Sequence, residues 1–303
     1  MANKNLDLAP VLLFVYNRPD HTRKILHALK NNLLAPESTL YIYADGPKND
    51  EDKRLVDQVY KAMKETTGFK EIIIKSHVKN IGLARSVIEG VSEVVNKHGS
   101  VIVLEDDIYT SSYFLTFMNE ALGYYRNEMK IFSISGYSYP ISIPPDYSKK
   151  FYFHYRSCSW GWATWADRWN TSNWDSENIR QILNDQEQGK RFKAKCGDDL
   201  LPMTKKYLLG KIDSWAIRWA YTHFIHDGLC VYPLHSLVKN IGMDGSGTHF
   251  KKKSDYLGTQ IGWEPNELTF DRSFEVNPQI HQSIHKLLDV SIIRKVINRI
   301  FLR

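Results

Sequence analysis

The chain has 303 residues, of which 43% are hydrophobic and 24% are charged, and its formal net charge is +6. This length suits one large domain or two interlocked domains, and the composition is that of an ordinary globular protein. No apolar run is long enough to span a membrane, and the first ten residues, MANKNLDLAP, lack the basic-then-apolar pattern of a signal sequence.

The cysteines indicate the redox compartment of the protein, and the net charge indicates the kind of partner that it binds. Cys158, Cys196 and Cys230 are scattered without the spacing of a metal site, and their odd number is typical of reduced thiols in a cytoplasm. The modest positive charge suits an anionic small molecule or an anionic membrane surface. We therefore expect a cytoplasmic protein that is not exported and has no nucleic-acid partner.

Strand and helix patterns alternate through the first 135 residues. Short apolar runs predict strands, and the segments between them carry apolar residues at helical spacing. The runs lie at residues 11–16, 39–44, 71–75, 101–104 and 130–135. This alternation predicts right-handed βαβ units and a parallel sheet, so the expected fold class is α/β.

The chain changes character after residue 135. Prolines mark a loop, further strands are predicted at 151–156 and 229–233, and a polar helical stretch runs to about residue 188. A helix is expected over 211–226 and a flexible, glycine-rich loop over 240–249.

Tryptophan is concentrated in one short stretch. Five of the eight tryptophans lie between Trp160 and Trp174. Aromatic faces can stack on sugar rings, and Gly161 between Trp160 and Trp162 would permit a ligand to approach closely. The alternative is an aromatic-rich core helix.

A buried strand, VIVL at residues 101–104, is followed at once by Glu105, Asp106 and Asp107. In an open α/β sheet, ligands bind outside the carboxyl ends of the strands. Clustered carboxylates there would repel one another without a cation, and oxygen ligands favour Mg²⁺ or Mn²⁺. The alternative is a solvated acidic loop or a helix N-terminus. The neighbouring sequence favours the metal site.

Several motifs occur in an order that resembles nucleotide-sugar glycosyltransferases of the GT-A fold, a Rossmann-like, mostly parallel sheet flanked by helices with an acceptor-side region after it. More narrowly, the chain resembles the N-acetylglucosaminyltransferase I family and related bacterial capsule and lipopolysaccharide glycosyltransferases. The resemblance covers about residues 10–250, and its most specific segments are VIVLEDDI, SWGWATW, IDSWAIRWAY and SLVKNIGMDGSGTHF.

The resemblance implies an activity and a set of partners. The expected enzyme is a metal-dependent, inverting hexosyl- or N-acetylhexosaminyltransferase that uses a nucleotide-sugar donor, with UDP as the expected nucleotide. Its acceptor would be a glycan or a lipid-linked glycan in polysaccharide biosynthesis. The cofactor would be Mn²⁺ or Mg²⁺, which neutralises the leaving diphosphate.

The resemblance also assigns residues to the donor site. The loop of Tyr16, Asn17 and Arg18 would meet the base, ribose or phosphates, and Asp45 would accept a hydrogen bond from the base. Other expected donor contacts are Arg85, Glu105, Asp106 and Trp160. Asp107 and His249 would be metal ligands. Alternatives are that Asp45 only shapes its turn, that Arg85 is a solvated helix residue and that His249 is structural.

The general base is the least certain position in the pattern. The family has a carboxylate directly before or after the tryptophan of IDSWA, where this chain has Ser214 and Ala216. Asp213 is the nearest carboxylate and is the expected base. The alternative role of Asp213 is a helix N-cap. The fallback candidates for the base are Asp198 and Asp199.

The predicted organisation has a nucleotide-sugar-binding half at residues 1–135, an acceptor-binding and catalytic half at 136–270, and a C-terminal helical tail at 271–303. Residues 289–303 place apolar side chains on one helical face beside a basic remainder, as in helices that lie on anionic membranes. The same stripe would also suit packing on the domain or a dimer seam.

Two other functions fit parts of the sequence. A sugar-nucleotide nucleotidyltransferase would share the sheet, but it would need a glycine-rich phosphate loop after the first strand, where this chain has Asn17, Arg18 and Pro19. A degenerate carbohydrate- or nucleotide-binding protein of the same fold would explain Ser214 and Ala216. The sequence specifies neither the sugar nor the linkage.

Overall fold

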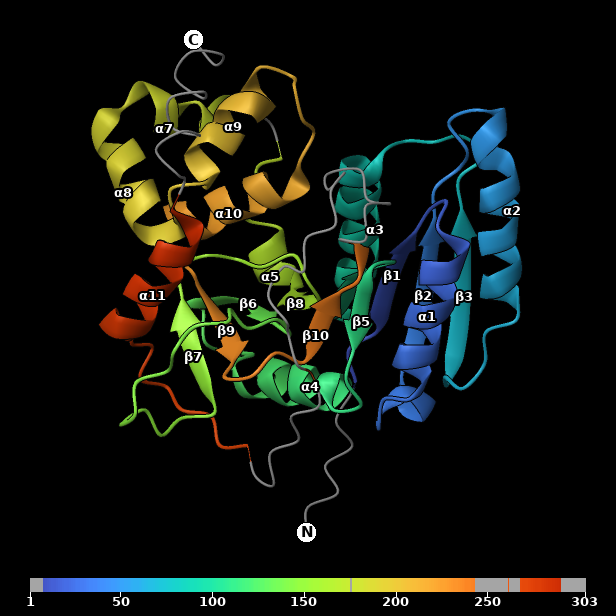
Figure 1. Ribbon diagram of the computed structural model, residues 1–303, viewed down its shortest axis with the longest axis horizontal. Coiled ribbons are helices and arrows are strands. Elements are labelled where there is room, and N and C mark those ends of the chain that lie inside the picture. The colour runs from blue at the N-terminus through green and yellow to red at the C-terminus, as the bar shows by residue number, and fades with distance from the viewer. Residues whose placement is uncertain (1–7, 175, 243–260, 262–267, 290–303) are drawn as a thin grey trace.

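A computed structural model describes residues 8–174, 176–242, 261 and 268–289 of the chain. These residues form an eight-stranded sheet and a separate two-stranded sheet (Figure 1). In spatial order the large sheet contains β3 (Glu71–Ser76), β2 (Thr39–Ala44), β1 (Val11–Val15), β4 (Ser100–Glu105), β8 (Trp162–Trp165), β6 (Ile131–Ser135), β9 (Leu229–Pro233) and β7 (Phe151–His154). The small sheet pairs β5 (Ile108–Thr110) with β10 (Val238–Asn240).

The large sheet is mostly parallel, which confirms the predicted α/β class. Strands β3, β2, β1 and β4 pair in parallel. Strand β8 is antiparallel to both of its neighbours, and β7 is antiparallel to β9. Strands β6 and β9 come before and after the predicted boundary at residue 135 and pair in parallel. One continuous sheet therefore contains strands from both predicted halves.

Helices cover both faces of the sheet. The bounds of the helices are α1 (Pro19–Lys30), α2 (Asp50–Lys64), α3 (Leu83–His98), α4 (Phe114–Tyr124), α5 (Ala166–Trp169), α6 (Ser176–Ile179), α7 (Gln181–Asn184), α8 (Gln186–Cys196), α9 (Leu200–Leu208), α10 (Trp215–Ile225) and α11 (Pro278–Leu288). A short 3₁₀ helix spans Ala35–Glu37.

Alternate residues of β1 supply two different core layers. Leu13 packs in a core with α1, α2 and α4, whereas Leu12 packs with α3 and α10 on the other face. Side chains of a strand alternate between faces, and burial on both faces is why β1 and β4 are continuous apolar runs. Helices α6 to α9 form a third core with α10, away from the sheet (Figure 1).

The tryptophan-rich stretch supplies a buried strand, β8, and the short helix α5, so the core alternative holds for Trp162, Trp165 and Trp169. Trp162 and Trp165 belong to β8, and Trp162 stacks on Trp215 with ring centroids 5.1 Å apart. Trp162, Trp169 and Trp219 are 0–1% exposed. The expectation of sugar stacking is therefore wrong for these buried rings, because a sugar cannot reach side chains that are 0–1% exposed.

Two other boundaries differ from the sequence prediction. The helix expected from residue 211 begins only at Trp215, because Ser214 adopts an extended conformation and its side chain accepts a hydrogen bond from Ile217 N. Part of the expected loop at 240–249 is strand, since β10 continues to Asn240. Residues 243–249 lie outside the described residues, as does nearly all of the amphipathic segment at 289–303.

Within the described residues, no helix combines the length and apolarity needed to cross a bilayer.

A chain of hydrogen bonds joins α11 to β7 and α8. Arg156 N donates to His154 Nδ1 at 3.0 Å, and His154 Nε2 lies 3.0 Å from His281 Nδ1. His281 Nε2 lies 3.0 Å from the Ala194 carbonyl oxygen. A carbonyl only accepts and a backbone N–H only donates, so both imidazoles must be neutral for all three bonds to form. Protonating either imidazole ring would break this series of hydrogen bonds.

The electrostatics agree with this neutral pair. Burial lowers the pKa of His154 well below its usual 6.5, and the neighbouring His281, His285 and Arg156 lower it further. Burial and the nearby His285 also lower the pKa of His281. The unfolded chain therefore takes up protons at mildly acid pH that the folded chain does not bind.

We expect the free energy of unfolding to fall as the pH drops below about 6.5, the ordinary histidine pKa. The stabilisation is fully present above that value and is lost progressively as the pH falls below it, with the deeply buried His154 as the main contributor. Urea unfolding at a series of pH values measures this slope. His281→Gln should flatten the slope, whereas the exposed control His27→Gln should not. A slope that is unchanged in His281→Gln would contradict the role of this pair.

Candidate active site

The acidic stretch at the end of β4 consists of Glu105, Asp106 and Asp107. It lies beside the β1 loop, which consists of Tyr16, Asn17 and Arg18, at one edge of the sheet. The parallel register places Phe14 of β1 opposite Glu105 of β4, so the residues that follow each strand are neighbours. Arg18 Nη1 lies 3.2 Å from Asp107 Oδ2 and 3.6 Å from Asp106 Oδ1. Tyr16 N donates to Asp106 Oδ2 at 3.3 Å. The structure thus brings together Tyr16, Arg18, Asp106 and Asp107.

The carboxylates at this edge outnumber their cation. Burial raises the pKa of Glu105 to about 8, and Asp107 and Asp106 raise it as well, against smaller opposing effects of Arg18 and a hydrogen bond from Trp215. Burial likewise raises the pKa of Asp106 to about 7, while Arg18 opposes the shift. These shifts favour the neutral forms of Glu105 and Asp106 near neutral pH, whereas a bound divalent cation would stabilise their charged forms.

The small sheet brings a distant part of the chain onto Asp107. Strands β5 and β10 pair antiparallel, and Ile241 N donates to the Asp107 carbonyl oxygen at 2.8 Å. A Cβ added to Gly242 would lie only 2.5 Å from Asp107 Oδ2 and 3.1 Å from Arg18 Nη1. Only glycine fits at 242 without displacing these side chains. Gly242 was not among the predicted site residues, although it lies in the SLVKNIGMDGSGTHF segment.

Tyr16 and Asn17 share a partner that the sequence analysis also missed. Asp52 Oδ2 accepts from Tyr16 Oη at 2.6 Å, and Asp52 Oδ1 accepts from Asn17 Nδ2 at 2.7 Å. Asp52 lies in the first turn of α2, where an acidic residue is expected from the helix dipole alone. Because the helix dipole alone explains an acid at this position, the contacts of Asp52 with Tyr16 and Asn17 could not be predicted from the sequence.

Asp45 lies at the end of β2 and organises the loops around it. Its Oδ1 accepts from the backbone N–H groups of Gly46 and Ile81, each at 2.9 Å, and its Oδ2 accepts from Gly82 N at 3.0 Å. Asp45 therefore shapes its turn, which was the alternative reading. An ionised carboxylate has about four acceptor sites, so a contact with a nucleotide base stays a prediction.

Arg85 and Trp160 lie differently from the residues around Asp107. Arg85 on α3 is 66% exposed in its side chain and donates from Nε to Glu89 Oε1 at 2.7 Å, as a solvated helix residue does. Trp160 is partly buried, and its ring packs edge-on against Tyr137 with centroids 4.6 Å apart. Neither has a described contact with Arg18 or the acidic stretch.

Asp213 lies just before α10, one residue ahead of the N-cap Ser214. Its side chain is 68% exposed, and Arg218 Nη2 donates to Asp213 Oδ1 at 3.0 Å. The N-cap alternative for Asp213 is therefore wrong, because Ser214 caps the helix. The hydrogen bond between Trp215 and Glu105 brings this end of α10 toward the acidic stretch.

The two fallback carboxylates are differently placed. Asp199 receives both Nη atoms of Arg156 at 2.8 Å, so both of its oxygens are occupied. Asp198 lies 3.4 Å from Lys193 Nζ.

The residues at this edge fit a metal only in part. Within the described ranges, no group of three or more His, Cys, Asp and Glu side chains is arranged to hold a metal ion. His249, the second predicted ligand, lies outside the described residues. Mg²⁺ is commonly held by one or two carboxylates together with substrate phosphates, so Asp107 could serve as a single protein ligand beside a diphosphate.

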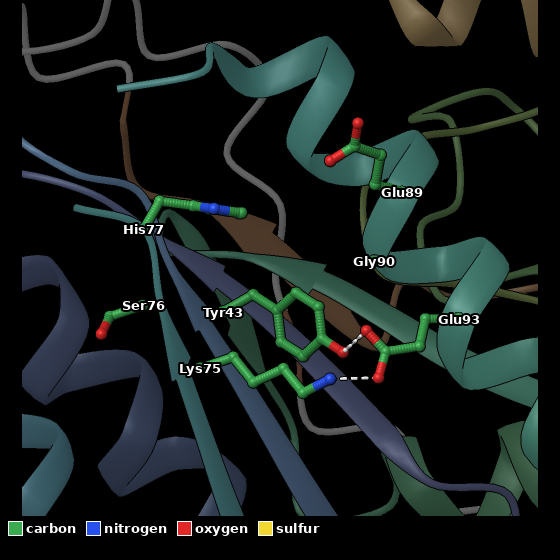
Figure 2. A pocket seen from close by; sticks show the side chains of 7 residues that line it. All are labelled: Tyr43, Lys75, Ser76, His77, Glu89, Gly90 and Glu93. Carbon is green, nitrogen blue, oxygen red and sulfur yellow. Dashed lines mark hydrogen bonds and ion pairs between the residues drawn. The ribbon is translucent and has the colours of Figure 1, made fainter. Parts of the chain in front are cut away.

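A polar pocket of about 380 Å³ lies elsewhere, between β3 and α3 (Figure 2). Within it Glu93 accepts from Tyr43 Oη at 2.9 Å and pairs with Lys75. Because these groups satisfy one another, we assign the pocket no ligand. It is lined by Tyr43, Lys75, Ser76, His77, Glu89, Gly90 and Glu93, none of which is a predicted site residue.

Two solved structures resemble this chain at low sequence identity. No model of a known protein family matches the sequence, and no curated protein sequence matches it. The mannosyltransferase PcManGT from Pyrobaculum calidifontis, solved in complex with GDP-Man and Mn²⁺, is 12% identical, with 60% of this chain and 50% of that chain covered and a TM-score of 0.35. S. aureus TarS 1–349 is 9% identical, with 78% of this chain and 61% of that chain covered and a TM-score of 0.42. This chain therefore spans about half to three-fifths of the length of these two proteins.

Proposed function

We propose that the chain is a metal-dependent glycosyltransferase of the GT-A fold that takes a nucleotide-sugar donor. The observation that carries the proposal is the meeting of Arg18 with Asp106 and Asp107 at the carboxyl ends of β1 and β4. This is the edge at which open α/β sheets bind ligands. A fixed guanidinium beside clustered carboxylates suits a diphosphate together with a divalent cation.

Within this proposal each group has a defined task. Arg18 would hold the diphosphate by its positive charge, and the hydrogen bond from Ile241 N holds the Asp107 backbone, with Gly242 leaving room for the Asp107 side chain. Asp107 would be the protein ligand of Mn²⁺ or Mg²⁺, and His249 stays a second proposed ligand. When bound, the metal would neutralise the charge that develops on the leaving diphosphate. Asp106 and Glu105 would face the ribose or the sugar.

The acceptor side of the proposal rests on Asp213. In an inverting transfer, a carboxylate removes the proton from the acceptor hydroxyl as that oxygen attacks the anomeric carbon. Asp213 is exposed and paired with Arg218, so it could meet an acceptor arriving from solvent. We propose residues 1–135 as the donor half and 136–270 as the acceptor half. A UDP-linked hexose or N-acetylhexosamine donor and a glycan or lipid-linked glycan acceptor remain proposals, as does contact of the C-terminal tail with an anionic membrane.

Asp107→Ala is expected to weaken the binding of UDP in Mn²⁺ by at least about 10-fold, because a metal site loses its carboxylate. Binding in EDTA should change little. Isothermal titration calorimetry with and without Mn²⁺ measures both quantities. Asp20→Ala, which removes an 84%-exposed carboxylate from the first turn of α1, is the control. Equal affinities of wild type and Asp107→Ala in Mn²⁺ would place the metal elsewhere.

Donor turnover separates this function from the alternatives. A glycosyltransferase should release nucleoside diphosphate from a nucleotide sugar in Mn²⁺. A nucleotidyltransferase would instead form the nucleotide sugar from a nucleoside triphosphate and a sugar phosphate, and a binding protein would do neither. The exposure of Asp213 keeps the binding protein as the second candidate. Binding of nucleotide sugar without release in any metal would favour it.

A further inference from the structure

Asp52 sits at a helix terminus but does not behave as a capping residue. Asn49 is the N-cap of α2, and its Oδ1 accepts from Asp52 N at 3.0 Å. In a capping box, the acidic residue three positions later would return a hydrogen bond to the N-cap backbone. Both Asp52 oxygens are instead directed at the β1 loop, toward Tyr16 and Asn17.

Tyr16 is held at both ends. Its hydroxyl donates to Asp52 at 2.6 Å and accepts from Lys48 N at 3.2 Å, while its backbone N–H donates to Asp106 at 3.3 Å. The ring therefore spans the distance between the first turn of α2 and the acidic stretch. Lys48 Nζ lies 5.5 Å from the ring centroid, which adds a cation–π contact.

Asn17 extends the same arrangement toward Arg18. Asp52 Oδ1 fixes the Asn17 amide at 2.7 Å, and the next residue, Arg18, reaches Asp106 and Asp107. Charge-assisted hydrogen bonds this short are stronger than neutral ones. Hydrogen bonds from Tyr16 and Asn17 lower the pKa of Asp52, so the carboxylate stays charged as an acceptor at neutral pH.

We infer that Asp52 is a positioning residue for the nucleotide-sugar site, because its carboxylate fixes the Tyr16 ring and the Asn17 amide in the loop that presents Arg18. This inference rests on the proposed function. Asp52 itself contacts no reacting atom in the proposal. Its contribution is a loop that is already ordered before the nucleotide binds, which spares the nucleotide the cost of ordering it.

Asp52→Ala is expected to weaken UDP binding in Mn²⁺ by about 10-fold, because the charge-assisted hydrogen bonds from Tyr16 and Asn17 are both lost, with turnover at saturating donor nearly unchanged. The matched control is Glu51→Ala, which removes the neighbouring exposed carboxylate from the same helical turn. Because both variants lose one negative charge near the helix N-terminus, an effect of the dipole alone would appear in both. Tyr16→Phe removes the hydrogen bond between Tyr16 and Asp52 by deleting the tyrosine hydroxyl.

The effects of Tyr16→Phe and Asp52→Ala on UDP binding should not be additive. If Asp52 acts through Tyr16, the double variant Tyr16→Phe/Asp52→Ala should bind UDP little worse than Asp52→Ala. Hydrogen exchange of the peptide that contains Tyr16 and Asn17, measured without nucleotide, should be faster in Asp52→Ala than in Glu51→Ala. Melting temperatures of the variants confirm that each is folded.

The possible results are distinguishable. Wild-type affinity in Asp52→Ala, or an equal loss in Glu51→Ala, would overturn the positioning role while leaving the proposed function intact. Failure of wild-type protein to bind any nucleoside diphosphate with Mn²⁺ would overturn the proposed function and the positioning role with it. A loss confined to Asp52→Ala, with faster exchange of the β1 loop, supports both.

Discussion

Asp213→Asn is expected to lower the turnover of a nucleotide-sugar donor by at least about 100-fold, the usual effect of removing a positioned general base. An amide cannot take the proton of the acceptor hydroxyl. Asparagine keeps the oxygen that accepts from Arg218 at 3.0 Å, so the start of α10 should stay in place and UDP affinity should be nearly unchanged. Initial rates with a panel of nucleotide sugars and glycan acceptors, together with calorimetry of UDP binding, measure the two effects separately.

Asp227→Asn provides a matched control for this variant. Asp227 is 61% exposed and pairs with Lys195, so its replacement also removes an exposed, ion-paired carboxylate, but beyond the other end of α10. Its turnover should equal that of wild type. Undiminished turnover in Asp213→Asn would assign the base elsewhere, first to Asp198, because both oxygens of Asp199 are engaged by Arg156.

The parts of the fold that depend on local patterning could be predicted from the sequence. The runs at 11–16 and 101–104 are strands that are buried on both faces, and such strands are recognisable without knowing their partners. The position of the acidic stretch beside the β1 loop follows from the parallel order of these strands. The resemblance to GT-A glycosyltransferases placed Arg18 and Asp107 in one site, and this strand order explains why the two residues are neighbours.

The parts that depend on distant pairing could not be predicted in this way. Strand β8 runs against its neighbours and is composed of tryptophan, alanine and threonine, so no periodic pattern separated it from a helix. The contact of Gly242 with Asp107 arises only because β10 pairs with β5. Asp52 had a sufficient local explanation as a first-turn acid, and its bonds to Tyr16 and Asn17 cross between separate elements.

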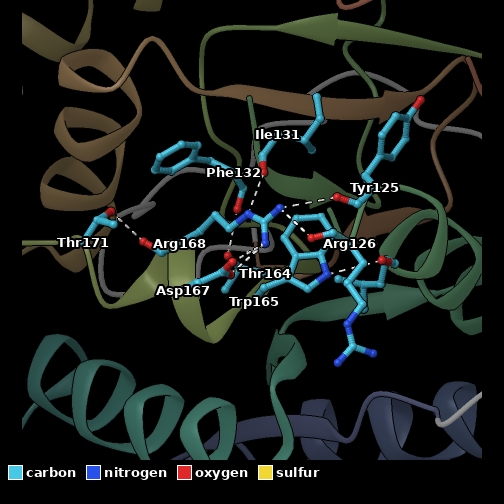
Figure 3. Close-up of polar contacts among 10 residues, drawn as sticks. Tyr125, Arg126, Ile131, Phe132, Thr164, Trp165, Asp167, Arg168 and Thr171 are labelled. Atoms are coloured by element: carbon cyan, nitrogen blue, oxygen red, sulfur yellow. Dashed lines mark hydrogen bonds and ion pairs between the residues drawn. The ribbon is translucent and has the colours of Figure 1, made fainter. Parts of the chain in front are cut away.

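Arg168 is another residue whose role the sequence did not reveal. It is 1% exposed, and its guanidinium joins β6 to the end of α4 (Figure 3). Nη2 donates to the Arg126 carbonyl oxygen at 2.7 Å and Nε donates to the Ile131 carbonyl oxygen at 3.3 Å. Nη1 pairs with Asp167 at 2.7 Å, and the guanidinium carbon lies 4.6 Å from the Trp165 ring centroid. The Arg168 guanidinium therefore donates hydrogen bonds to backbone carbonyl oxygens of the turn that leads into β6.

Arg168→Met is expected to lower the free energy of unfolding by about 3 kcal/mol or more, the sum of lost hydrogen bonds to a charged group and of carbonyl oxygens left buried without a donor. Methionine keeps most of the side-chain length, so the loss should reflect polar contacts more than a cavity. Asp167 is 54% exposed and should be solvated once its partner is gone, which limits its share. Urea unfolding measures the change, with the exposed Arg23→Met as the control, since its pair with Asp20 lies at the surface and should be worth less than about 1 kcal/mol. Equal stability of the Arg168→Met and Arg23→Met proteins would show that water replaces the guanidinium at these carbonyls and that the turn into β6 does not depend on it.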